Sequence, residues 1–487
     1  MMNSKYTSLL IHGGRIVDPG QGMDQVGDLL VDEGKIAQLC GGRPIAIASG
    51  EKQPVMLDAT GLVVCPGFID LHCHLREPGF EYKETIATGT KAAAVGGFTT
   101  VCCMANTNPP LDNRETVEHV KQKADEEGFV HVLPIGCITK GRRGEEVCHM
   151  TELAGAGVVA FSDDGAPVSN SLVMRHALDY GRVLGLPIIE HCEDKELSGG
   201  GIINEGWLSA REGLKGIPAA AEEIMVARDL ILAKLTGARI HIAHVSTCGS
   251  VELIRHAKEE GIPVTAEVTP HHLTLTEERI MGNTDVIASE AKQSRYDTNA
   301  KVNPPLRTKD DIKCLIRGLK DGVIDAIATD HAPHTFEDKN CELGLAAFGI
   351  SGFETAFGCL MGLVHRGEIG LPLLISKLTY EPARIIGKDG GLGVLKVGAP
   401  ANITIFDPDR EWVVDSSQFA SKGKNTPFDG YKFKGKVMAT IVNGKVVYTD
   451  ELLKGRFESL VCHSGEAERL KSLTQDKSHE GEKSHCG

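Results

Sequence analysis

The sequence predicts an α/β fold in which a (β/α)8 TIM barrel is joined to a small composite β-sandwich built from both ends of the chain. The first observation is that eight apolar runs in the middle of the chain are each followed by a stretch with helical spacing. The second is that short alternating runs with Gly, Asp and Pro turns fill the first sixty residues and return near the C-terminus. The third is the length of 487 residues, which fits a large barrel with a smaller unit.

The two ends of the chain are expected to form the sandwich together. The runs SLLIHGGRIVDP and DLLVDEGKIAQLC near the N-terminus resemble ANITIFDP and KVMATIVNGKVVYTD near the C-terminus, where Asn443-Gly444 predicts a hairpin. The predicted domains are 1–60 for the first part of the sandwich, 61–388 for the barrel, 389–455 for the second part of the sandwich and 456–487 for a polar tail that we expect to be disordered.

Eight apolar runs supply the predicted barrel strands. Because they show little polar alternation, we expect strands buried on both faces, as in a parallel sheet. A doubly wound open sheet is the alternative, but eight units without a Gly-rich phosphate loop favour the barrel. Segment 283–296 falls outside the pattern and is interpreted as a loop insertion. The runs are 63–75, 98–106, 130–139, 157–165, 186–194, 238–246, 263–273 and 325–334.

Composition argues against several classes of function. A net charge of −14 would repel phosphate backbones, so we expect no nucleic-acid partner. No apolar run approaches the roughly 20 residues of a membrane span, and the N-terminal residues do not resemble a secretory signal. The 14 cysteines are scattered and form no zinc-ribbon or redox motif, so we interpret them as reduced thiols of a cytoplasmic protein.

Polar side chains cluster where the predicted strands end, which is the catalytic face of a (β/α)8 barrel. In the first strand, His72, His74 and Arg76 share one face because strand side chains alternate. Burying this many imidazoles and carboxylates without a cation would be costly, and these ligand types suit zinc. There are enough of them for two metals bridged by one carboxylate and a hydroxide. The candidates from the other strand ends are Asp163, Asp164, His191, His244 and Asp330.

Six motifs carry a resemblance to a known family. Together DLHCHLREPG, FSDDG, EHCED, HIAHVST, KVNPPLR and ATDHAPH resemble class I dihydroorotases of the amidohydrolase superfamily, and the similarity extends over residues 5–450. The resemblance implies zinc-dependent, reversible interconversion of N-carbamoyl-L-aspartate and L-dihydroorotate, a step of pyrimidine biosynthesis. It also implies a homodimer as one expectation and an aspartate transcarbamoylase complex as another.

The resemblance also implies a role for each candidate residue. His72, His74 and Asp330 would hold one metal, and His191 and His244 a second. Only one of Asp163 and Asp164 can bridge, because neighbouring strand residues point opposite ways. The family's spacing to the His of the fifth strand favours Asp164, with Asp163 as the fallback. Asp330 would act as general base and acid. Arg76, Asn106 and His334 would bind the substrate carboxylate, and Asn303 would contact the pyrimidine ring.

Two other functions compete with this interpretation. Hydantoinases, dihydropyrimidinases and allantoinases are related cyclic amidohydrolases, but many relatives carry a carboxylated Lys at the bridging place, and GVVAFSDDG contains no Lys. A non-catalytic subunit that scaffolds aspartate transcarbamoylase typically loses metal ligands, whereas every expected ligand is present here. Ala105 departs from the family, which usually has Pro before the Asn, and this weakens the positioning argument for Asn106.

Overall fold

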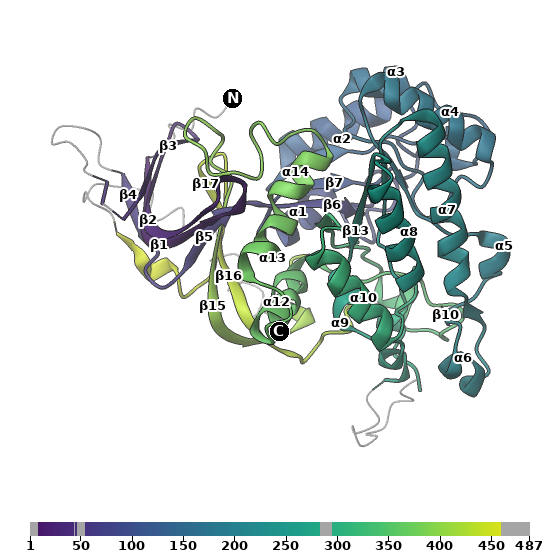
Figure 1. Ribbon diagram of the computed structural model, residues 1–487. Coiled ribbons are helices and arrows are strands. Elements are labelled where there is room, and N and C mark those ends of the chain that lie inside the picture. The colour runs from purple at the N-terminus through teal and green to yellow at the C-terminus, as the bar shows by residue number, and fades with distance from the viewer. Residues whose placement is uncertain (1–7, 43, 46–53, 283–294, 459–487) are drawn as a thin grey trace, which may run out of the picture.

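The computed structural model describes residues 8–42, 44–45, 54–282 and 295–458. A β-rich unit made of both chain ends lies beside a larger unit in which helices surround a central sheet (Figure 1). Most of the predicted insertion 283–296 and most of the predicted tail 456–487 lie outside the described residues. No helix in the described ranges is long and apolar enough to cross a membrane.

Eight parallel segments close into a barrel. One sheet has the order β6-β7-β8 and a second has the order β14-β13-β12-β9. Phe161 joins the two sheets through parallel bridges to Gly136 and Ile188, and a bridge from Cys73 to His331 closes the circle. The strands are β6 (Phe68–Cys73), β7 (Phe98–Cys103), β8 (His131–Pro134), β9 (Ile188–Glu190), β12 (Ile240–Ile242), β13 (Val264–Val268) and β14 (Ala326–Ile327).

This closure confirms the predicted (β/α)8 barrel, with two local differences. The fourth segment, predicted as a strand over 157–165, is reduced to single bridges at Phe161. The run 63–75 is split at Gly67 between two sheets, because β5 (Val63–Pro66) pairs with the sandwich strands and only β6 enters the barrel. A Cβ at Gly67 would lie 2.2 Å from Thr99 Oγ1, so only glycine permits the close approach at this crossing. The chain therefore leaves the sandwich at Gly67, after the boundary that we predicted at residue 60.

Helices cover the outside of the barrel. Several begin at a polar cap, as where the Asn170 side chain accepts hydrogen bonds from Leu172 N and Val173 N at the start of α4. The main helices around the barrel are α1 (Ile86–Val95), α2 (Arg114–Glu127), α3 (Met150–Ala156), α4 (Ser171–Leu184), α7 (Ala219–Thr236), α8 (Cys248–Glu259), α10 (Lys309–Lys320), α12 (Phe353–His365), α13 (Leu371–Leu378) and α14 (Tyr380–Ile385). Shorter elements near the strand ends are α5 (Lys195–Ser198), α6 (Trp207–Glu212), α9 (Pro270–Thr274), α11 (Phe336–Lys339), β10 (Ile203–Asn204) and β11 (Gly216–Ile217).

The sandwich unit is a nine-stranded sheet shared by both chain ends. Its main path runs β17-β16-β15-β5-β1-β2-β3, and β5 joins the two ends by pairing with β1 and β15. The predicted hairpin at Asn443-Gly444 is confirmed, with both residues at positive φ between β16 and β17. Besides β5, the strands of this sheet are β1 (Leu9–Asp18), β2 (Met23–Asp32), β3 (Lys35–Gly41), β4 (Val55–Asp58), β15 (Ile403–Val413), β16 (Lys432–Val442), β17 (Lys445–Thr449) and β18 (Phe457–Glu458). The predicted domain division is not otherwise tested and stays a prediction.

The cysteines follow the expectation with one exception. A disulfide joins Cys248 on α8 to Cys314 on α10, so the interpretation of every cysteine as a reduced thiol is wrong at these two positions. The two residues lie 66 positions apart in sequence, and only the packing of α8 against α10 brings them together. The other cysteines in the described ranges are free thiols, and most of them are buried.

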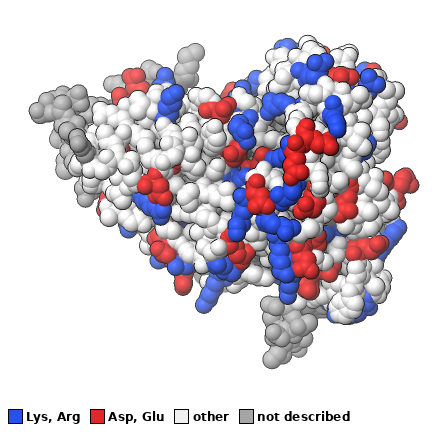
Figure 2. Space-filling view, viewed as in Figure 1, with Lys and Arg blue, Asp and Glu red and all other residues white. Residues whose placement is uncertain are grey.

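Charges of both signs interleave on the outer face of the helices around α8 and α10 (Figure 2). The pairs Lys258–Asp325, Arg255–Asp321 and Lys234–Glu260 lie within 3.0 Å on this side of the barrel. Lys234 and Glu260 are both exposed, and exposed pairs of this kind contribute little to stability. This face of the barrel is therefore a solvated surface of mixed charge.

Candidate active site

A cavity of about 370 Å³ opens at the carboxyl ends of the barrel strands. This is the end of a parallel barrel where loops from several strands can bring side chains together. The predicted residues that line it are His74, Arg76, Asn106, Asp164, His191, His244, Asn303, Asp330 and His334. His72 is fully buried and contacts the same cluster from within the barrel.

Asp330, His72 on β6 and His74 just after β6 form the first half of a His/Asp cluster. The Nε2 atom of His74 lies 3.0 Å from Asp330 Oδ1, and the Nε2 atom of His72 lies 3.7 Å from the same oxygen. Burial alone would raise the pKa of Asp330, but the hydrogen bond from His74 and the charge of His72 hold this pKa below its ordinary value. Asp330 is therefore an ionised carboxylate, able to accept a proton.

Asp164 lies between that half and the second pair of histidines. One of its oxygens, Oδ1, is 3.3 Å from His72 Nε2 and 3.6 Å from both His191 Nδ1 and His244 Nε2. Its other oxygen is 3.6 Å from His74 Nε2. Asp164 thus faces all four imidazoles, which is the position that a bridging carboxylate would need.

The donor set fits a divalent metal. Ligand atoms of His72, His74 and Asp164 lie within 4.8 Å of one another, and so do those of Asp164, His191 and His244. Both His72 Nε2 and Asp164 Oδ1 are buried without a hydrogen-bond partner in the part of the chain that the structure describes. Buried polar atoms are rarely left unpaired, so a cation in this cluster would resolve the deficit.

Asp163, the fallback for the bridging position, points away from the cluster. Its carboxylate accepts hydrogen bonds from Ile138 N at 2.8 Å, from Thr139 N and from Thr139 Oγ1. Burial raises its pKa to about 6 despite these hydrogen bonds. Asp163 therefore holds the chain that follows β8, while Asp164 enters the cavity, as expected for neighbours of opposite orientation.

Three of the four imidazoles have a polar partner on the nitrogen that faces away from the cluster. His72 Nδ1 is 2.9 Å from Glu267 Oε1, His74 Nδ1 is 2.9 Å from Asn106 Oδ1, and His191 Nε2 is 3.0 Å from Glu193 Oε2. Such partners fix the orientation and tautomer of a metal-binding histidine. Glu193 and Glu267 were not among the residues predicted for the site. The signals were present, since Glu193 stands two residues after His191 and Glu267 is a lone acid within the buried run PVTAEVTPHHL.

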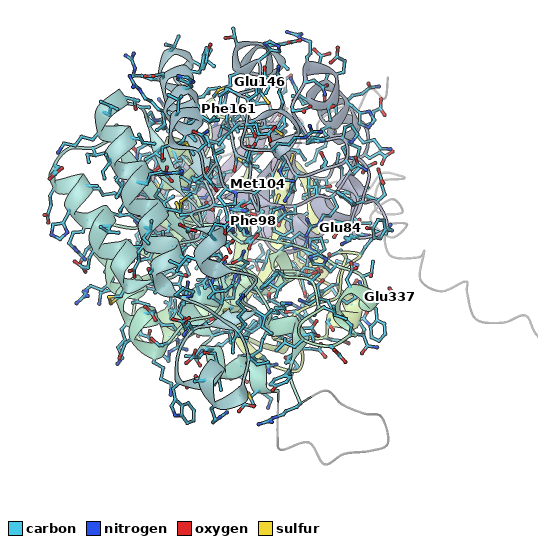
Figure 3. All side chains as sticks on the ribbon, turned by 90° about the vertical axis from the view of Figure 1, so that its right-hand side faces the viewer. Glu84, Phe98, Met104, Glu146, Phe161 and Glu337 are labelled. Carbon is cyan, nitrogen blue, oxygen red and sulfur yellow. A yellow bond between two sulfur atoms is a disulfide. The ribbon has the colours of Figure 1, made fainter. Side chains whose placement is uncertain are left out.

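His331, next to Asp330, does not join the cluster. Its Nδ1 accepts from Gly352 N at 3.1 Å, and its ring stacks on Phe353 with centroids 4.1 Å apart. Its Nε2 lies 3.5 Å from Glu84 Oε2. Glu84 is labelled in Figure 3, which looks onto the side of the barrel away from the sandwich. His331 therefore anchors the loop that carries Asp330.

Arg76 and His334 form a cationic wall on one side of the cavity. Arg76 has φ 65°, and its NH2 atom lies 3.3 Å from His334 Nε2. Burial lowers the pKa of Arg76 to about 10, which still leaves it charged at neutral pH. Burial together with the charges of Arg76 and Lys83 lowers the pKa of His334 to about 3, so its imidazole is neutral. A guanidinium beside a neutral imidazole is an arrangement able to bind a carboxylate.

Asn303 also lines the cavity. Its Nδ2 donates to Glu193 Oε2 at 2.8 Å, and Lys195 Nζ donates to the same oxygen. The hydrogen bond and charge of His191, followed by those of Lys195, lower the pKa of Glu193 against the effect of its burial. The carboxylate is thus ionised and fixes the Asn303 amide at the cavity edge.

Backbone strain also gathers at this site. Arg76, His244 and Asp330 all have positive φ, at 65°, 32° and 47°. Non-glycine residues rarely adopt this conformation, and it commonly marks functional sites. At positive φ these three side chains leave the backbone in directions that a regular strand would not give them.

The segment between β15 and β16 reaches from the sandwich to this site. Asn425 Oδ1 accepts a hydrogen bond from His334 N at 2.9 Å, and Asn425 Nδ2 donates to Gly349 O at 3.0 Å. Ser351 N donates to Asn425 O at 2.7 Å. The sandwich unit therefore supports the loop that follows β14.

Known proteins with similar sequences and structures fit this geometry. A family model described as dihydro-orotase-like matches residues 61–250. The chain is 53% identical over 441 residues to a dihydroorotase of Thermoanaerobacter sp. (strain X514), covering 90% of this chain and 97% of that protein. It is 52% identical over 447 residues to a dihydroorotase of Pelotomaculum thermopropionicum, covering 92% and 100%. It also resembles the solved L-hydantoinase (dihydropyrimidinase) from Arthrobacter aurescens, with 27% identity, a TM-score of 0.78 and coverage of 93% and 97%.

The barrel, its composite sandwich and the buried His/Asp cluster define the protein as a cyclic amidohydrolase, an enzyme that hydrolyses cyclic amide bonds. The identity of about half over nine-tenths of the chain is more specific than the fold. The chain belongs to the dihydroorotase family, which confirms the resemblance that its motifs predicted.

Proposed function

We propose that this member of the dihydroorotase family catalyses the reversible, zinc-dependent interconversion of N-carbamoyl-L-aspartate and L-dihydroorotate in de novo pyrimidine biosynthesis. The observation that supports this most is the position of Asp164 among four imidazoles, with the Arg76 and His334 wall bordering the same cavity. The first feature suits hydrolysis of an amide bond. The second suits a substrate that carries a carboxylate next to the ring.

One or two zinc ions are the cofactor that we propose. His72, His74 and Asp330 would hold one ion, His191 and His244 the other, and Asp164 would bridge them. When bound, zinc would lower the pKa of water and polarise the ring carbonyl. Glu267, Asn106 and Glu193 would keep the imidazoles in the orientation that such a site needs.

Asp330 is the proposed general base and acid. Its carboxylate is ionised and borders the cavity, so it can take a proton from the water that attacks the ring carbonyl. As the C–N bond breaks, Asp330 delivers that proton to the leaving ring nitrogen. In the opposite direction the same carboxylate accepts the proton from the nitrogen that closes the ring, and water leaves.

The substrate carboxylate would bind at the wall formed by Arg76 and His334, with Asn106 as a further contact. The planar guanidinium can donate two parallel hydrogen bonds to a carboxylate. Asn303, fixed by Glu193, would contact the pyrimidine ring. In this arrangement the ring carbonyl would lie between Asp330 and Asp164.

Two competing functions stand against this proposal, and further expectations accompany it. The solved neighbours include hydantoinases, so another cyclic amide is the competing substrate class, and a non-catalytic scaffold for aspartate transcarbamoylase is the competing role. A homodimer and a complex of the active enzyme with aspartate transcarbamoylase also belong to the proposal, and their support is the family resemblance alone. A cytoplasmic location belongs to it as well, supported by the free thiols of the described ranges.

The test is a metal count and an activity assay on one preparation. The protein is purified without chelator, zinc per chain is measured, and hydrolysis of L-dihydroorotate is followed alongside hydantoin, dihydrouracil and allantoin. About one or two zinc ions per chain, with dihydroorotate turnover that chelator abolishes, is the expected result. Metal with turnover of another cyclic amide alone would favour the competing substrate class, and no metal and no turnover after zinc addition would favour the scaffold.

A further inference from the structure

Two lysines are buried beside the active-site cavity without a carboxylate partner. Lys301 is 2% exposed and Lys339 is 4% exposed. Among the described residues, no Asp or Glu forms an ion pair with either ammonium. Burying a charge in this way is costly unless other polar groups surround it, so these positions demand an explanation.

Backbone carbonyls take the place of the missing carboxylates. Lys301 Nζ donates to Leu343 O at 2.7 Å, to Gly344 O at 3.1 Å and to Ala346 O at 2.6 Å. Lys339 Nζ donates to Ala347 O at 2.7 Å and to Gly349 O at 3.0 Å. Lys339 Nζ also reaches Lys301 O, at 3.4 Å, which links the two lysines. An ammonium has three N–H donors. Three loop carbonyls therefore saturate Lys301, and two loop carbonyls together with Lys301 O saturate Lys339.

The loop held in this way, residues 343–349, borders the cavity. Phe348 and Gly349 line it, and Gly349 N donates back to Lys301 O at 2.9 Å. The Phe348 ring lies 4.4 Å from Lys301 Nζ, within range of a cation–π interaction. Gly349 has φ 127°, and a Cβ there would lie 2.6 Å from Ala332 Cβ. The loop is therefore packed tightly against the residues that follow Asp330.

One carbonyl of this loop determines the state of His334. Phe348 O lies 2.8 Å from His334 Nε2, and Lys83 Nζ lies 3.3 Å from His334 Nδ1. Because a carbonyl only accepts and an ammonium only donates, the hydrogen of the neutral imidazole must be on Nε2. That nitrogen is the one that lies 3.3 Å from Arg76 NH2. This N–H donates to Phe348 O and Nδ1 accepts from Lys83 Nζ, so the loop fixes the His334 ring beside the guanidinium that would bind a carboxylate.

We infer that Lys301 and Lys339 are positioning residues for substrate recognition: by binding carbonyls of residues 343–349 they hold the Phe348 carbonyl, which fixes the His334 ring beside Arg76, the guanidinium that would bind the substrate carboxylate. The inference rests on the proposed function, because it assumes a carboxylate at the wall formed by Arg76 and His334. It assigns to these lysines a role in binding and none in the chemical step. Their loss should therefore raise KM with little change in kcat.

The experiment compares Lys339→Met and Lys301→Met with Lys377→Met in the zinc-loaded enzyme. Methionine keeps an unbranched side chain of similar length but removes every N–H donor. Lys377 is a matched control, since it is also buried and its Nζ donates to a carbonyl, Ile324 O at 2.7 Å, away from the cavity. KM for L-dihydroorotate should rise about 10-fold or more in the first two variants, with kcat within about 3-fold and zinc content unchanged. Unchanged KM in both, or an equal rise in Lys377→Met, would overturn the inference.

A second measurement covers the case in which the lysine variants do not fold. In the unaltered enzyme, saturating L-dihydroorotate should slow amide hydrogen exchange in residues 343–349 by about 10-fold, because the bound carboxylate holds Arg76 against His334 and so stabilises the His334 contact with Phe348 O. Exchange that is unaffected there would contradict the coupling. An unaltered enzyme that does not turn over dihydroorotate would instead overturn the proposed function, so the two failures are distinguishable.

Discussion

Glu267 on β13 lies 2.9 Å from His72 on β6, from Oε1 to Nδ1, and both side chains are buried inside the barrel. The second carboxylate oxygen lies 3.1 Å from His241 Nε2. Burial would raise the pKa of Glu267, but these two imidazoles lower it to about 2. The carboxylate is therefore ionised and holds His72 with its Nε2 atom toward Asp164.

Replacing Glu267 with Gln should weaken zinc binding. The substitution keeps the shape of the side chain but removes the charge that orients His72, and loss of such a partner typically lowers metal affinity by about 10- to 100-fold. The measurement is zinc affinity by competition with a chromophoric chelator. Glu354→Gln is the control, because that carboxylate accepts a hydrogen bond from Ala420 N and contacts no proposed ligand. Equal zinc affinity in Glu267→Gln and the unaltered protein would refute the role of Glu267.

The neighbouring carboxylates Asp163 and Asp164 should fail in different ways. Asp164→Asn removes the carboxylate charge that faces four imidazoles, so zinc content should fall and kcat should drop by about 100-fold or more. Asp163→Asn should keep zinc but lose about 1–3 kcal/mol of unfolding free energy, because Ile138 N and Thr139 lose part of their acceptor. Metal analysis and urea unfolding of both variants check this. Comparable zinc loss in Asp163→Asn would count against Asp164 as the bridge.

Asn425 should affect the active site although it belongs to the segment between two sandwich strands. Its side chain bonds to His334 N and Gly349 O, so Asn425→Ala should raise KM for dihydroorotate by about 3- to 10-fold and lower stability by about 1–2 kcal/mol. Asn402→Ala is the matched control, because its side chain accepts from Asn443 N within the sandwich. Steady-state kinetics and thermal unfolding separate the two. A KM that rises equally in Asn402→Ala would show a general effect of sandwich stability.

The fold and the proposed ligands could be predicted because their signals are local. Strands buried on both faces read as continuous apolar runs, and the polar residues stand at the ends of those runs, as His72 and His191 do. The division at Gly67 was missed because the residues on its two sides are equally apolar, and the change of sheet depends on contact with Thr99. Where sequence neighbours differ only in orientation, as at Asp163 and Asp164, the pattern leaves a choice that the fold resolves.

The supporting residues could not be predicted because their partners are distant in sequence. Lys301 reads as a surface cation until the loop 343–349 folds over it. The same holds for Cys248, whose partner Cys314 lies on another helix. Such roles depend on tertiary contacts, and residue type and spacing alone do not reveal them.

His272 on α9 should make the protein less stable as pH falls. Its Nδ1 is 2.7 Å from Thr269 Oγ1 and its Nε2 is 2.9 Å from Pro304 O, and burial lowers its pKa from 6.5 to about 3. Between those two pH values the unfolded chain binds a proton at this position and the folded chain does not. Stability therefore rises with pH in this window, and it is lost as pH falls from 6.5 toward 3.

Replacing His272 with Gln should remove this contribution, because the amide can still donate to Pro304 O but does not titrate. Between pH 6 and pH 4, the unfolding free energy of the unaltered protein should fall more steeply than that of the variant by up to about 1.4 kcal/mol per pH unit. Urea unfolding of both proteins with chelator present isolates the effect, since zinc release at low pH would otherwise add to it. The buried contacts of His272 with Thr269 Oγ1 and Pro304 O favour its neutral form in the folded state. Parallel curves for the two proteins would contradict this, because they would mean that His272 binds a proton equally well in the folded and the unfolded chain.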